Sequence, residues 1–117
     1  MKITIPVSVG ELIDKITILQ IKEQHTNNEY VKKELNDLKK IASNIQYNKN
    51  LEYELFKINQ KLWNVEDTIR LKEKNQDFGV FFTELARDVY LLNDKRAEIK
   101  RKINEECKSE YKEIKCY

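Results

Sequence analysis

Several charged side chains of this 117-residue sequence stand where the helical pattern requires apolar groups. They are Asp14, Glu66, Asp67, Arg70, Arg87, Asp94 and Arg96. Arg96 interrupts an apolar seam, and Asp14 lies in one row with Ile18 and Ile21. An unpaired charge is costly to bury, so such groups should either pair with one another or serve a function.

Two interpretations of these charges are open. The first is a buried ion-pair network, for example Glu66 or Asp67 with Arg96 or Arg87, which would fix the register of the helices. The second is a polar pocket between helices that binds a small anion or metabolite, or performs acid–base chemistry. No individual catalytic residue is predicted, so the question of an enzyme stays open.

Metal and cofactor chemistry finds little support in the residue types. His25 is the sole histidine, and the only glycines, Gly10 and Gly79, form no phosphate-binding loop. Helical nucleotide pyrophosphohydrolases bind Mg²⁺ through EExxE and ExxD pairs, and Glu11 and Asp14 have the ExxD spacing. The EExxE half is missing, so we expect neither a metal site nor a cofactor.

The composition predicts a single domain over residues 1–117 built from long helices. Charged residues make up 36% of the chain, which has only 2 Gly and 1 Pro. Lys plus Arg number 22 and Asp plus Glu number 20, so the net charge of +2 gives no general attraction to nucleic acid. No apolar run is long enough to span a bilayer, and we expect no membrane partner.

The two cysteines, Cys107 and Cys116, lack metal-ligand spacing. The first residues lack the pattern of a secretory signal peptide. We therefore expect free thiols and a cytoplasmic protein, with Cys107 packed on an apolar seam and Cys116 exposed.

The periodicity predicts an all-α fold, an antiparallel bundle of about four long helices with a short extended segment before it. Ser8 and Glu11 form a capping box at the first helix, after the alternating residues 2–7. The helices are expected to cover residues 8–25, 28–47, 51–74 and 80–114. A heptad seam of the coiled-coil type runs through the third helix, at Leu51, Leu55, Ile58, Leu62, Val65 and Ile69.

The predicted fourth helix bears on the oligomeric state. A helix over residues 80–114 would be about 50 Å long, which exceeds the diameter of so small a domain. Its second half would then need partner surface from another copy, which predicts a homodimer. The alternative is a charged tail that frays after Cys107.

Three segments together resemble a small bacterial and phage family of uncharacterised all-helical proteins. They are IPVSVGELIDKITIL, LWNVEDTIR and FTELARDVYLLNDKRAEIKRKIN. The resemblance covers most of the chain and implies a compact helical protein of this length that stands alone. It transfers no catalytic residue, but it favours a specific role for the charged residues inside these segments, and for Asn93 beside them.

The sequence therefore predicts a self-associating helical interaction or scaffold protein. The alternative is a small metal- or anion-dependent enzyme, or a ligand-binding protein, with a polar site between helices. A pocket with converging polar groups would favour the alternative. A broad apolar surface on the first or fourth helix would favour the module.

Overall fold

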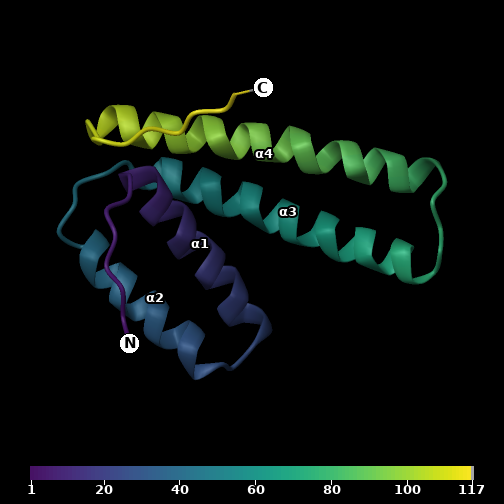
Figure 1. Cartoon of the computed structure of the whole chain (residues 1–117), viewed down its shortest axis with the longest axis horizontal. Helices are drawn as coiled ribbons and strands as arrows, with labels where there is room; N and C mark the ends of the chain where they lie inside the picture. Colours follow the sequence, from purple (N-terminus) through teal and green to yellow (C-terminus); the bar gives the residue numbers. More distant parts are fainter. Residues whose placement is uncertain (117) are drawn as a thin grey trace.

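Four α-helices make up the protein, as a computed structural model that describes residues 1–116 shows (Figure 1). They are α1 (Val9–His25), α2 (Glu29–Ala42), α3 (Lys49–Lys74) and α4 (Val80–Glu106). The described chain contains no strand, so the predicted all-α bundle is confirmed. Of these helices, none has both the length and the apolar character needed to cross a membrane.

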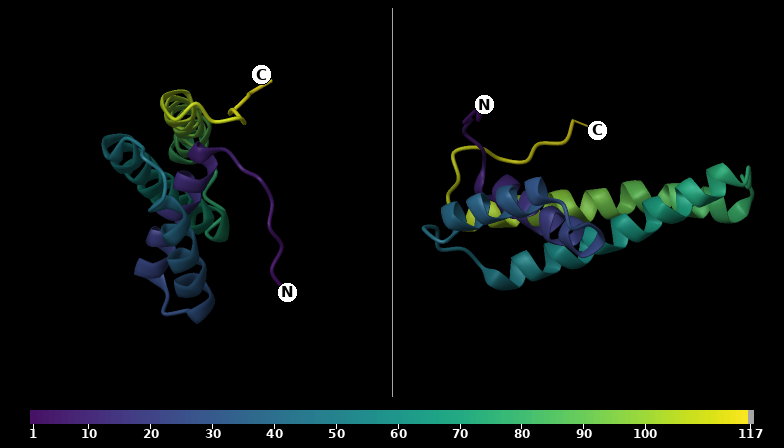
Figure 2. Two further views of the ribbon diagram at one scale, coloured as in Figure 1. Left: turned by 90° about the vertical axis from the view of Figure 1, so that its left-hand side faces the viewer. Right: turned by 90° about the horizontal axis from the view of Figure 1, so that it is seen from below.

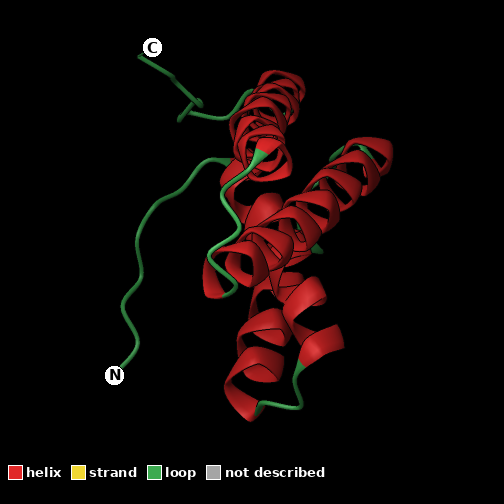
Figure 3. Ribbon diagram, turned by 90° about the vertical axis from the view of Figure 1, so that its right-hand side faces the viewer, coloured by secondary structure: helices red, strands yellow, loops and turns green. Residues whose placement is uncertain are grey.

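The start of α1 is set by the cap that the sequence predicts. Ser8 is extended, and its hydroxyl accepts a hydrogen bond from the Glu11 amide at 3.0 Å. Residues 1–7 precede the cap without helical structure, and all seven are exposed. They project away from the helices (Figures 2 and 3).

Helix α1 lies at the centre of the fold and packs against all three other helices. Its side chains Ile13 and Ile16 are almost completely buried, together with Leu35 of α2, Leu55 of α3 and Ile103 of α4. A helix that is apolar on two sides is expected in this position.

Helix α2 is shorter than predicted, since it ends at Ala42 and not near residue 47. Its start agrees with the prediction, because the Asn28 side chain caps it by accepting from the Tyr30 amide at 2.8 Å. At its end the Ser43 hydroxyl donates to the Lys40 carbonyl at 2.6 Å, which offers the backbone a local alternative to the helix.

Helix α4 ends at Glu106, so the predicted continuation to residue 114 is wrong. Residues 109–116, here called the strap, turn back along α4 (Figure 1). With 27 residues, α4 is about 40 Å long, shorter than the helix on which the predicted dimer was argued.

The turn after α4 has the hydrogen bonds of a Schellman motif. The Ser109 amide donates to the Asn104 carbonyl at 2.9 Å, and the Lys108 amide donates to the Glu105 carbonyl at 3.3 Å. Lys108 adopts a φ of 53°, in the left-handed region that usually calls for glycine. The Ser109 hydroxyl then accepts from the Val9 amide at 3.2 Å, which anchors the turn to α1.

The outer halves of α3 and α4 form a two-helix hairpin that extends beyond α1 and α2 (Figure 1). We call residues 63–92 the distal arm. At its base His25, the last residue of α1, stacks on the Trp63 ring at 4.7 Å. Within the distal arm no residue is fully buried, although apolar residues recur along both helices.

Candidate functional site

The buried carboxylate of Asp14 is the centre of the polar contacts between α1, α3 and α4. Asp14 is 1% exposed, and its Oδ1 accepts from Arg96 Nε at 2.9 Å while its Oδ2 accepts from Arg96 Nη2 at 2.5 Å. Asn59 Nδ2 of α3 also donates to Asp14 Oδ1, at 2.9 Å. One carboxylate therefore joins three helices through charge-assisted hydrogen bonds.

Two further side chains complete this network. The Thr17 hydroxyl donates to the Asp14 carbonyl at 2.7 Å and accepts from Asn59 Nδ2 at 2.9 Å. Arg96 Nη1 donates to Asn93 Oδ1 at 3.4 Å. The hydrogen bonds that Arg96 donates to Asp14 raise the pKa of the guanidinium further above its ordinary value, against the effect of burial, so the Arg96 side chain stays charged.

A second ion pair lies one helical turn further along α4. Lys100 is 6% exposed, and its Nζ lies 2.8 Å from Glu11 Oε2 and 3.1 Å from Glu113 Oε2. Burial opposes the charged form of Lys100. Its hydrogen bonds to Glu11 and Glu113 outweigh that effect and raise its pKa above the ordinary value.

These contacts explain the ExxD spacing of Glu11 and Asp14. Glu11 and Asp14 lie three residues apart on α1, and Lys100 and Arg96 lie four residues apart on α4. Glu11 pairs with Lys100 and Asp14 pairs with Arg96, so each carboxylate already has a cation as its partner. Within residues 1–116 no group of three or more His, Cys, Asp or Glu side chains could hold a metal ion.

Helices α1 and α4 approach closely at Gly10. The Gly10 amide donates to Asn104 Oδ1 at 2.6 Å. A Cβ at Gly10 would lie 2.6 Å from the Lys100 carbonyl oxygen, so only glycine fits here. Asn104 is 0% exposed, and its Nδ2 has no hydrogen-bond partner among the described residues.

The predicted site residues separate into three groups. Asp14 and Arg96 meet, so the charged partner of Arg96 is Asp14, and its predicted pairing with Glu66 or Asp67 is wrong. Asp94 lies on the outer side of α4 and pairs with Lys115 at 2.9 Å. The other four predicted residues are exposed on the distal arm, and none of their side chains forms a hydrogen bond or ion pair within residues 1–116: Glu66, Asp67, Arg70 and Arg87.

Sequence reasoning missed the uncharged members of the network. Asn59 lies four residues after Leu55 and three before Leu62, so its polar side chain lies beside Ile58 on the inner face of α3. That spacing could have identified it. Gly10 also carried a signal, since it is the only glycine inside a predicted helix, whereas Asn104 has no feature that distinguishes it from exposed asparagines.

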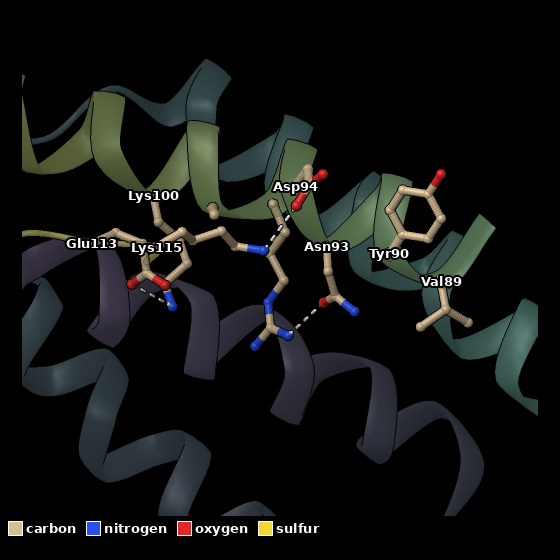
Figure 4. A pocket seen from close by; sticks show the side chains of 9 residues that line it. Val89, Tyr90, Asn93, Asp94, Lys100, Glu113 and Lys115 are labelled. Atoms are coloured by element: carbon tan, nitrogen blue, oxygen red, sulfur yellow. Dashed lines mark hydrogen bonds and ion pairs between the residues drawn. The ribbon is translucent and has the colours of Figure 1, made fainter. Parts of the chain in front are cut away.

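A cavity of about 610 Å³ lies along α4 beside this network, between the helix and the strap. Figure 4 shows the side chains that line it: Val89, Tyr90, Asn93, Asp94, Arg96, Ala97, Lys100, Glu113 and Lys115. The strap is fixed over it by the ion pairs of Glu113 with Lys100 and of Lys115 with Asp94.

Comparison with known proteins places the chain in a family. No curated protein and no solved structure matches it. A family model matches residues 1–117, and the chain therefore belongs to that family, a family of unknown function designated DUF6165.

Proposed function

We propose that the protein is a self-associating helical module, and that the distal arms of two copies pack together as a homodimer. The observation that carries this proposal is the absence of any fully buried residue from 63 to 92, although both helices of the arm carry apolar seams. Two helices alone cannot enclose a core, whereas two such hairpins can form a four-helix bundle of the coiled-coil type.

Exposed apolar side chains occur along the arm. Those nearest its tip are Leu71 at 57%, Phe78 at 53%, Val80 at 72% and Phe81 at 68%, and Tyr90 at 53% and Leu91 at 42% lie nearer its base. At roughly 100 Å² each, the four nearest the tip expose on the order of 400 Å². A standard interface buries about 800 Å² on each partner, so these four side chains alone would supply about half of one.

The charges on the arm favour a second copy as its occupant. Glu66 and Asp67 on α3, and Arg70 and Arg87 beside them, have no partner within residues 1–116. In a two-fold symmetric pair each surface meets its own copy, so unpaired acids of one chain can face unpaired arginines of the other. A single arm carries both signs of charge and is therefore complementary to itself.

Other features favour a cytoplasmic protein without a nucleic-acid partner. Cys107 and Cys116 are free thiols, as is usual in a reducing compartment. The net charge of +2 is too small for general attraction to a phosphate backbone.

Analytical ultracentrifugation over a range of concentrations tests the dimer. The wild-type chain should sediment as a dimer, and Phe81→Glu should sediment as a monomer with unchanged helical circular dichroism. Tyr30→Glu is the matched control, because Tyr30 is 85% exposed but lies on α2, away from the arm. A wild-type monomer at every concentration, or equal dissociation by both variants, would contradict the proposal.

A further inference from the structure

The cavity between α4 and the strap has a charged end and an apolar end. Lys100, Glu113 and Lys115 gather at one end, and Val89 and Tyr90 lie at the other, with Asn93 between them (Figure 4). From Tyr90 to Lys100, α4 rises about 15 Å. The volume of about 610 Å³ is within the usual range of small-molecule sites. The shape suits an elongated ligand with one polar end.

The charged end already holds a carboxylate. Glu113 of the strap places its Oε2 3.1 Å from Lys100 Nζ, and Lys100 is buried apart from this contact and its pair with Glu11. Of the two carboxylates that Lys100 binds, one comes from helix α1 and the other only from the strap. A carboxylate from outside the chain could take this position charge for charge.

Glu113 can leave Lys100 without disturbing the helices. It belongs to the strap and its side chain is 27% exposed, whereas the Lys100 side chain is 7% exposed and keeps its pair with Glu11. Tyr111 and Ile114 of the same segment are exposed at 48% and 74% and contribute little packing. Loss of one partner of a buried ion pair is costly, so Glu113 leaves when another carboxylate takes its place and keeps Lys100 paired.

We propose that this cavity binds a small organic acid with an extended apolar body. The carboxylate of the ligand replaces that of Glu113 at Lys100, and Glu113 turns toward solvent. The body of the ligand lies along α4, past Asn93, and contacts Val89 and Tyr90. Two of the residues that the sequence singled out, Asp94 and Arg96, form part of the wall. This site is separate from the apolar tip of the distal arm.

Titration of the ¹⁵N-labelled full chain with octanoate and decanoate, followed by amide chemical shifts, tests this site. Both acids should shift the amides of Tyr90, Asn93, Lys100 and Glu113, and octanol and decanol should not. Glu113→Gln removes the internal competitor and should tighten binding by about five-fold or more, because the Lys100 side of this pair is buried. Glu113 lies outside the helices, so this variant should keep the fold.

Glu110→Gln is the matched control, because Glu110 is exposed on the same segment and should leave the affinity unchanged. The absence of shifts with both acids, in the wild type and in Glu113→Gln alike, would overturn the proposal. Equal binding of the alcohols, or equal affinity in Glu113→Gln and the wild type, would overturn the role of the carboxylate.

Discussion

Asp14 and Arg96, 82 residues apart in the sequence, form a two-point ion pair that fixes α1 against α4. Asp14 is almost completely buried, and the Arg96 side chain is 28% exposed. Such a pair orients the two helices more strictly than apolar contacts, because both guanidinium–carboxylate bonds require one relative rotation.

Arg96→Leu should therefore destabilise the protein strongly. The substitution would leave Asp14 buried with only the Asn59 amide as a hydrogen-bond donor. Loss of one partner of a buried pair costs about 3–5 kcal/mol in free energy of unfolding. Urea denaturation followed by circular dichroism measures this change, with Arg87→Leu as the control because Arg87 is exposed and unpaired. Equal stabilities of the two variants would refute a structural role for the pair.

The helices and the importance of Asp14 and Arg96 could be predicted from the sequence, because both follow from local periodicity. A seam from Leu51 to Ile69 identifies a helix and its inner face. Charges that break a seam are recognisable in the same way. The partner of Arg96 could not be predicted, since that depends on how α1 rotates and crosses α4, which no single helix encodes.

The end of α4 could not be predicted for a different reason. The apolar pattern continues through Cys107, and no glycine or proline follows Glu106 to indicate a stop. The helix ends because Lys108 accepts a left-handed conformation and Ser109 bonds to α1. The bond between Ser109 and α1 is a tertiary contact, and the position of the strap and its cavity depends on it.

Gly10→Ala tests the close approach of α1 and α4. Alanine usually favours a helix by about 1 kcal/mol over glycine. Here its Cβ would lie 2.6 Å from a backbone oxygen of α4, and the resulting overpacking should cost about 1–3 kcal/mol or more. Thermal unfolding should show a lower melting temperature. Gly79→Ala is the matched control, because its Cβ would come no closer than 3.7 Å to Asp77, and it should change stability by less than about 1 kcal/mol.

Lys100 should make the stability of the protein fall at high pH. Its pKa in the folded protein is raised above the ordinary value of 10.5, because Glu11 and Glu113 favour the charged form. Its contribution is therefore fully present below pH 10.5 and is lost as the pH rises through the folded-state pKa. Urea denaturation from neutral pH to about pH 11.5 should show this loss in the wild type and a smaller one in Lys100→Arg, since arginine stays charged there. Parallel curves for the two proteins would contradict this assignment.

Lys108→Gly should stabilise the protein by relieving the backbone at the end of α4. Lys108 has a φ of 53°, where a Cβ meets the following carbonyl, and glycine adopts this conformation without that contact. The gain should be about 0.5–1 kcal/mol, somewhat reduced by the greater freedom of glycine in the unfolded chain.

Gln76→Gly, at the matching turn after α3 with a φ of 54°, should give a similar gain. Lys112→Gly has no positive φ to relieve and should give none. Chemical denaturation of the three variants separates these outcomes. A loss of stability in Lys108→Gly would show that contacts of the Lys108 side chain stabilise the protein by more than its left-handed backbone costs.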